Sequence, residues 1–144
     1  MIAMSYDPNN IFAKILRGEV PAERIFEDAE TLAFMDIMPR CDGHALVIPK
    51  GPARNMLDAA PAQLAACLRT AQLVGRAQMT AFAATGVTVQ QFNEASGGQV
   101  VFHLHYHVMP RHDGVALRPH TGTMAKPEVL SANAAKLRAA IKPN

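Results

Sequence analysis

The stretch His103-Leu104-His105-Tyr106-His107-Val108-Met109 places three of the chain's six histidines at every second position. A β-strand sends successive side chains to opposite faces, so a strand here would hold all three imidazoles in one row. In an α-helix, side chains two positions apart differ by about 200° in direction, and the imidazoles would scatter. The spacing therefore predicts a strand over residues 99–109 and a functional site on one of its faces.

Three imidazoles on one strand face are suited to two kinds of chemistry. Imidazole is a common zinc ligand, and three of them leave an open coordination position. Alternatively, one imidazole attacks an electrophile while its neighbours orient it and bind the transferred group. A neutral imidazole has the necessary lone pair near neutral pH. The spacing does not choose between a metal site and a nucleophile, but the strict alternation disfavours a row without chemical role.

A stretch of small residues precedes the histidines, between two predicted strands, and includes Gly97 and Gly98. Adjacent glycines allow backbone N–H groups to approach an anion closely. The side chains of Asn93 and Gln99 are further candidate donors. A plain hairpin turn, which needs glycine for its backbone angles, is the alternative. Beside a row of histidines, the turn favours a phosphate-binding site.

Hydrophobic periodicity predicts an α+β domain with a five-stranded, mostly antiparallel sheet. Asp7 and Pro8 are suited to the N-cap and first turn of a short helix. Pro61 begins a long helix that extends to about residue 84, with Gly86 as its C-cap. The domain spans residues 1–111, and residues 112–144 form an irregular arm and a terminal helix. The predicted strands are residues 24–27, 31–36, 44–49, 87–93 and 99–109.

Length and composition narrow the class of protein. The chain has 144 residues, the length of one domain. Its net charge is +2 and it has no run of Lys or Arg, so we expect no nucleic-acid partner. No apolar stretch approaches the roughly 20 residues that cross a bilayer. The isolated Cys41 and Cys67 are typical of a reducing compartment, so we expect a cytoplasmic protein without a membrane partner.

The histidine stretch matches the motif His-φ-His-φ-His-φ-φ, where φ is apolar, and resembles the histidine triad (HIT) superfamily of nucleotide hydrolases and transferases. Residues 11–21, 32–37 and 43–50 resemble the opening helix, the hairpin and the third strand of that family. The resemblance implies a HIT-like fold and a homodimer whose two sheets join into one of ten strands. It also implies a small-molecule nucleotide, preferably a purine, as the ligand.

The resemblance also implies roles for individual residues. His105 would attack the α-phosphate and carry the nucleotidyl group as a phosphoramidate that water hydrolyses. His107 would bind the phosphate and assist the leaving group, while His103 and His44 would orient the row. The implied nucleotide-binding residues are Asp36 at the ribose, Ile37, Phe12 and Leu46 around the base, and Asn93, Gly98, Gln99 and Val100 at the phosphate.

Two departures from the family pattern qualify this resemblance. Some members bind a structural zinc through a Cys-x-x-Cys where this chain has Asn10-Ile11-Phe12-Ala13, so we expect no metal and no cofactor. Many members have Ser or Thr where this chain has Val100, which removes one donor to the phosphate.

We therefore predict a hydrolase of nucleoside phosphoramidates or dinucleoside polyphosphates that forms a covalent nucleotidyl-histidine. The family's transferases usually have Gln in place of the last histidine, so His107 favours hydrolysis. The alternatives are a nucleotide-binding regulatory protein with weak or no turnover, and a three-histidine metalloenzyme.

Overall fold

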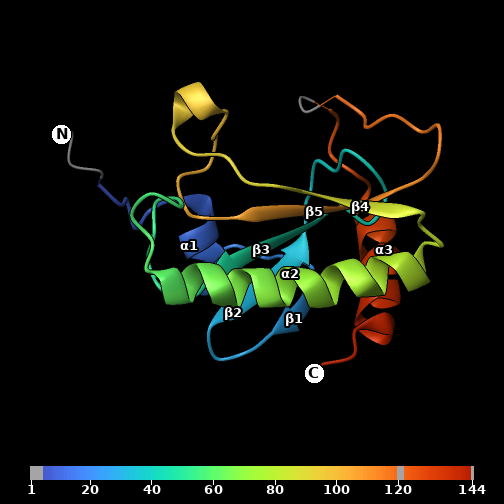
Figure 1. Ribbon diagram of the computed structural model, residues 1–144, viewed down its shortest axis with the longest axis horizontal. Coiled ribbons are helices and arrows are strands. Elements are labelled where there is room, and N and C mark those ends of the chain that lie inside the picture. Colours follow the sequence, from blue (N-terminus) through green and yellow to red (C-terminus); the bar gives the residue numbers. More distant parts are fainter. Residues whose placement is uncertain (1–4, 120–121, 144) are drawn as a thin grey trace.

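The computed structural model describes residues 5–119 and 122–143, which form one five-stranded sheet and three α-helices. The strand order is β1-β2-β3-β5-β4, and every neighbouring pair is antiparallel. Figure 1 labels the elements. The predicted α+β class and five-stranded antiparallel sheet are confirmed. The elements are α1 (Ile11–Leu16), β1 (Arg24–Glu27), β2 (Thr31–Met35), β3 (Ala45–Pro49), α2 (Pro61–Ala81), β4 (Gly86–Gln90), the 3-10 turn η1 (Ala95–Gly97), β5 (Tyr106–Arg111) and α3 (Pro127–Ala140).

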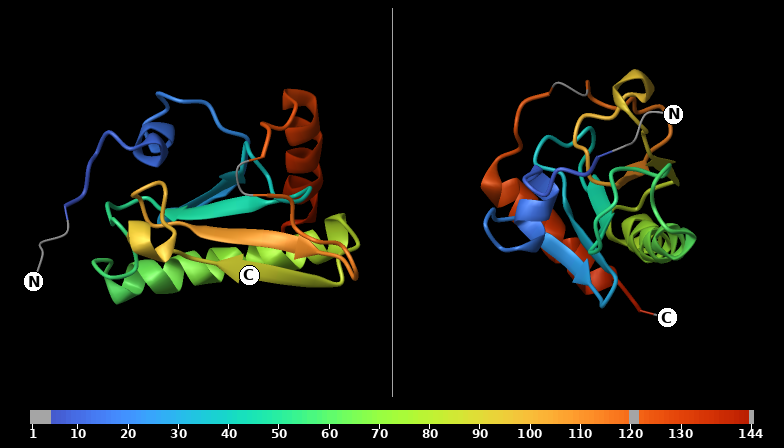
Figure 2. Two further views of the ribbon diagram at one scale, coloured as in Figure 1. Left: turned by 90° about the horizontal axis from the view of Figure 1, so that it is seen from above. Right: turned by 90° about the vertical axis from the view of Figure 1, so that its left-hand side faces the viewer.

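Each face of the sheet has its own hydrophobic cluster, because strand side chains alternate between faces. Figure 2 shows α1 and α2 on opposite sides of the sheet. Val47 and Val108 face α2 and α3, whereas Leu46 and Ile48 face α1. His107 pairs in register with Leu46. The side chain of His107 therefore lies on the α1 side of the sheet.

The strand β5 begins later than the sequence predicted. It starts at Tyr106, so of the three motif histidines only His107 lies within a strand. The ladder between β3 and β5 ends at the pair Val47 and Tyr106. Beyond it β3 ends at Pro49, which has no N–H to donate, and the backbone N–H of Leu104 donates instead to the carbonyl of Ala53 at 2.8 Å. The prediction of one strand over residues 99–109 was wrong for its first half.

Other boundaries also differ from the prediction. Asn10, rather than Asp7, caps α1, because its side chain accepts the N–H of Ala13 at 2.9 Å. The helix α2 ends at Ala81, and Gly86 is the first residue of β4 instead of a helix cap. The strand β4 ends at Gln90, three residues before the predicted end.

The arm after β5 returns along the loop that joins β2 to β3. The N–H of Arg118 donates to the carbonyl of Arg40 at 2.7 Å, and the N–H of Ala125 donates to that of Ile37 at 2.9 Å. The arm therefore supports the loop that carries Asp36 and His44. Within residues 5–119 and 122–143, no helix is long and apolar enough to cross a membrane.

Candidate active site

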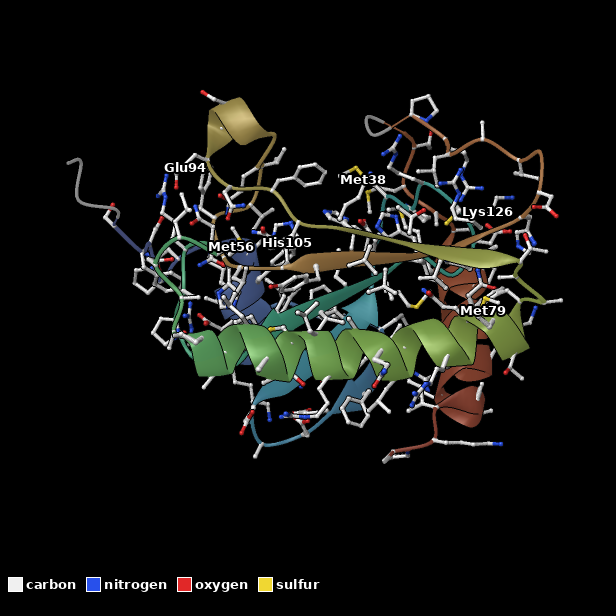
Figure 3. All side chains as sticks on the ribbon, viewed as in Figure 1. Met38, Met56, Met79, Glu94, His105 and Lys126 are labelled. Carbon is white, nitrogen blue, oxygen red and sulfur yellow. The ribbon has the colours of Figure 1, made fainter. Side chains whose placement is uncertain are left out.

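A cleft of about 230 Å³ lies on the α1 side of the sheet and brings together most of the predicted site residues. Its walls are mainly apolar, with a few polar groups, which is the usual composition of a small-molecule site. His105, labelled in Figure 3, lies immediately before β5, and its ring meets the Phe12 ring edge-on, with 4.9 Å between ring centroids. The predicted residues that line the cleft are Phe12, Asp36, Ile37, Leu46, Gly98, Val100, His105 and His107.

The position of the proton on His105 follows from a backbone contact. Nδ1 of His105 lies 2.6 Å from the carbonyl oxygen of His103. A carbonyl oxygen only accepts, so Nδ1 carries the proton and donates it. The lone pair of the neutral ring is then on Nε2. His105 is thus held in the tautomer that a nucleophile attacking through Nε2 requires.

A chain of hydrogen bonds orients His107. The backbone N–H of Arg40 donates to Nδ1 of His44 at 3.0 Å, so the proton of His44 is on Nε2. That Nε2 lies 2.9 Å from Nδ1 of His107 and 3.4 Å from Oδ2 of Asp36. Nδ1 of His107 is therefore an acceptor, and its proton is on Nε2. The two cleft histidines are complementary: His105 offers a lone pair and His107 offers a donor.

His103 does not line the cleft and is completely buried behind it. Its Nε2 donates to the carbonyl of Pro49 at 2.9 Å. Burial lowers the pKa of His103 to about 4, so the ring is neutral at neutral pH. His103 thus acts on the site through its carbonyl oxygen, which holds His105.

The turn at Glu94–Gln99 is closed by its own backbone. The N–H groups of Gly97 and Gln99 donate to the carbonyl of Glu94 at 2.9 and 3.0 Å, and that of Gly98 donates to Ala95 at 3.0 Å. These three N–H groups therefore do not form the predicted phosphate nest, because closing the 3-10 turn occupies them. Gly98 has φ +97°, and a Cβ there would lie 3.2 Å from the Phe92 ring, so glycine serves the turn itself.

The side chains of Asn93 and Gln99 are also engaged within the protein. Oδ1 of Asn93 accepts the N–H of Met56 at 2.8 Å. The Gln99 amide donates to the carbonyls of Arg54 and Val101 at 2.8 and 3.0 Å. Both residues position the turn, and the prediction that the side chain of Gln99 is a phosphate donor is corrected by these contacts.

Three side chains of the site come close enough to bind a metal ion. Ligand atoms of Asp36, His44 and His107 lie within 4.8 Å of one another. A metal on Nε2 of His44 would move the proton of that ring to Nδ1, where it would oppose the N–H of Arg40 at 3.0 Å. The donor set therefore fits a hydrogen-bond relay better than a metal site.

The sequence missed the residues that support the site from a distance. Arg54 donates through Nε and Nη2 to the carboxylate of Glu94 at 2.8 and 2.9 Å. This pairing lowers the pKa of Glu94 and holds a residue whose φ of +63° is rare outside glycine. Tyr6 contacts His103. These residues are far apart in sequence and follow no periodic pattern, so only the fold reveals them.

Comparison with known proteins agrees with this geometry. Residues 17–114 match the HIT domain. A HIT-like protein from Bartonella henselae, described as involved in cell-cycle regulation and solved with an unknown ligand, is 48% identical with a TM-score of 0.91, and the match covers 96% of this chain and 100% of that one. A zinc-bound histidine triad family protein from Mycobacterium smegmatis is 32% identical with a TM-score of 0.80, and the match covers 92% of both chains.

A relative with a named activity is also similar. Adenylylsulfatase HINT3 from Arabidopsis thaliana is 35% identical over 101 residues, which are 70% of this chain and 51% of that protein. Members of the HIT family bind nucleotides and are generally nucleotide hydrolases. The resemblance seen in the histidine motif is confirmed: this chain belongs to the HIT domain family.

Proposed function

We propose that this protein hydrolyses nucleotides at the α-phosphate through a covalent nucleotidyl group on His105. One observation carries the proposal: the two cleft imidazoles are in opposite tautomers, with the lone pair of His105 and the proton of His107 both on Nε2. Asp36 lies in the same cleft and has the acceptors that a ribose diol needs. His105, His107 and Asp36 thus line one ligand-sized space, which supports these three roles.

In the first step, the lone pair on Nε2 of His105 forms a bond to the α-phosphorus. The bond from phosphorus to the leaving group breaks, and the leaving group departs with the electron pair. Nε2–H of His107 donates a hydrogen bond to the phosphoryl group or the departing atom, where negative charge develops. An amine leaving group also takes up a proton from water, whereas a phosphate or sulfate departs as an anion.

In the second step, water attacks the phosphorus and the bond between phosphorus and Nε2 of His105 breaks. The electron pair returns to Nε2, and the released proton passes to solvent. This route replaces one difficult attack by water with two easier displacements. Throughout both steps, Nδ1–H of His105 remains a donor to the carbonyl of His103, which stabilises the positive charge on the phosphorylated ring.

The apolar part of the cleft supports a nucleotide as the substrate. Phe12, Ile15, Phe34 and Leu46 provide an apolar lining that suits a base, preferably a purine. We propose a nucleoside phosphoramidate or a dinucleoside polyphosphate as substrate. An adenylyl sulfate is a third compound to include, because one relative is named an adenylylsulfatase.

The test is a substrate panel with trapping of the covalent intermediate. The purified chain is mixed rapidly with adenosine phosphoramidate, diadenosine polyphosphate or adenylyl sulfate, quenched, and analysed by peptide mass spectrometry. We expect an adenylyl group on His105 and a loss of turnover of about a thousandfold or more in His105→Ala. The matched control is His112→Ala, an exposed histidine outside the cleft, which should retain full activity. Full activity of His105→Ala would contradict the proposal.

A nucleotide-binding regulatory protein with weak turnover is the second candidate. Val100, which is 70% exposed at the cleft, offers no donor to a phosphate, and the N–H groups of Gly97–Gln99 are used within the turn. Measurable binding of AMP with no turnover of any compound in the panel would favour this candidate. A homodimer in the cytoplasm is part of the proposal, and a solution mass equal to one chain would contradict the dimer.

A further inference from the structure

The N-terminal segment contacts the histidine motif through Tyr6, 97 residues earlier in the chain. The Tyr6 hydroxyl lies 2.7 Å from Nδ1 of His103. The two rings meet edge-on, with their centroids 5.6 Å apart. The hydroxyl and the ring of Tyr6 therefore both contact a histidine that lies behind the cleft.

The direction of this hydrogen bond is fixed by the other side of the His103 ring. Nε2 of His103 faces the carbonyl of Pro49 at 2.9 Å and must carry the proton. Nδ1 is then an acceptor, and the Tyr6 hydroxyl donates to it. The Tyr6 hydroxyl and the Pro49 carbonyl therefore hold the His103 ring at both of its nitrogens.

The same histidine holds the residue that we propose as nucleophile. The carbonyl oxygen of His103 accepts Nδ1–H of His105 at 2.6 Å. A shift of His103 would therefore move the acceptor that sets the tautomer of His105. Tyr6, His103 and His105 form a continuous path from the N-terminal segment to the cleft.

The segment around Tyr6 is itself attached to the site. Nη1 of Arg54 donates to the carbonyl of Ser5 at 3.0 Å. The other guanidinium nitrogens of Arg54 hold the carboxylate of Glu94, in the turn beside the cleft. One arginine thus links the residue before Tyr6 to the turn that carries Gly98.

We propose that Tyr6 is a positioning residue for the nucleophile: its hydroxyl holds the His103 ring in place at Nδ1, and the carbonyl of His103 then orients His105. The effect on turnover rests on the proposed function. The effect on the His103 ring does not, and it can be measured in the protein without a substrate.

The test compares the wild type with Tyr6→Phe, which removes one oxygen and keeps the ring. Long-range ¹H–¹⁵N spectra report the proton position on each imidazole. We expect the Nδ1 resonance of His103 to lose its hydrogen-bonded shift in Tyr6→Phe, while Nε2 stays protonated opposite the Pro49 carbonyl. For adenosine phosphoramidate we expect kcat to fall about threefold to tenfold with KM unchanged.

The matched control is Tyr106→Phe, because Tyr106 packs in the cluster on the α2 side of the sheet. It should leave the His103 resonances in place and kcat within twofold of the wild type. Unchanged His103 resonances in Tyr6→Phe would overturn the inference, and so would changed resonances with unchanged kcat. If the wild type turns over no compound, the proposed function fails, and the spectra alone decide whether the Tyr6 hydroxyl holds the His103 ring.

Discussion

The two histidines that line the cleft are held by different kinds of partner. His105 donates to the backbone carbonyl of His103, whose ring is fixed in turn by the Pro49 carbonyl and the Tyr6 hydroxyl. His107 accepts from the side chain of His44, which lies beside the Asp36 carboxylate and accepts the N–H of Arg40. One support contacts His105 through a backbone carbonyl, and the other passes through a second imidazole that lies beside a carboxylate.

This difference in partners suits the two histidines to the two proposed roles, nucleophile for His105 and donor for His107. A nucleophile needs a constant lone pair, and a backbone carbonyl, which only accepts, keeps the lone pair of His105 on Nε2. A group that meets changing charge on a phosphate benefits from partners that respond to that charge, as side-chain networks do. Because their partners differ, the same residue type is suited to the proposed nucleophile at one position and to the proposed donor at the other.

After the loss of His105 itself, the largest effect is expected from removing the donor. In His107→Ala we expect kcat for adenosine phosphoramidate to fall about a hundredfold, near 2.7 kcal/mol, as for other donors that stabilise developing charge. His107→Gln restores an N–H and should recover about tenfold of that loss. Steady-state kinetics on both variants, with the Kd of AMP as the binding control, measures the difference. Equal activity of His107→Ala and wild type would remove His107 from the donor role.

The support of His105 is tested through the pH dependence of stability. The pKa of His103 is about 4 in the folded protein and near 6.5 in the unfolded chain. As pH falls, the unfolded chain binds the proton first, so the free energy of unfolding decreases between these values. From pH 6.5 to pH 5 we expect a loss of about 2 kcal/mol.

Urea unfolding at several pH values measures this loss, and His103→Gln is the reference because it has no imidazole at this position. The slope of stability against pH should be shallower in the variant over this window. The lowered pKa values of Glu94 and Asp28 affect the free energy of unfolding only at lower pH. A carboxyl group whose pKa is lowered by folding loses its stabilising contribution only as pH falls below its unfolded pKa near 4. Identical slopes would show that His103 is not held neutral.

A smaller effect on kcat than that of His107→Ala is expected from His44, which contacts His107 from behind. His44→Ala removes the donor to Nδ1 of His107, so the proton of His107 is no longer confined to Nε2. We expect kcat to fall about tenfold, near 1.4 kcal/mol, with the Kd of AMP little changed. His112→Ala again serves as the control. A loss as large as that of His107→Ala would show that His44 acts directly on the substrate.

Much of the fold was predictable because its signals are local. The alternation of Leu46 and Ile48 reports the two faces of β3, and the Pro61 helix start was placed correctly. The start of β5 was missed because Pro49, on another strand, ends the ladder that the motif would otherwise continue. The cap at Asn10 was missed because Asp7-Pro8 offers the same local signal three residues earlier.

The residues of the candidate site were also predictable only in part. His105, His107 and Asp36 were found from spacing and resemblance, and they line one cleft. The phosphate nest expected at Gly97–Gln99 was not found, because a short turn rich in glycine satisfies its own N–H groups before it can serve an anion. A turn that closes on itself and one that binds phosphate need the same residues, so composition does not separate them.

The sequence by itself determined which side chains are available and that they alternate along an extended segment, because strand periodicity is a local property. Only the tertiary structure decided which nitrogen of each imidazole carries its proton. The partners that decide it are distant in sequence: 54 residues separate His103 from Pro49, 63 separate His44 from His107, and 97 separate Tyr6 from His103. The reason is physical: a neutral imidazole has one proton and two nitrogens, and the group opposite each nitrogen selects between them.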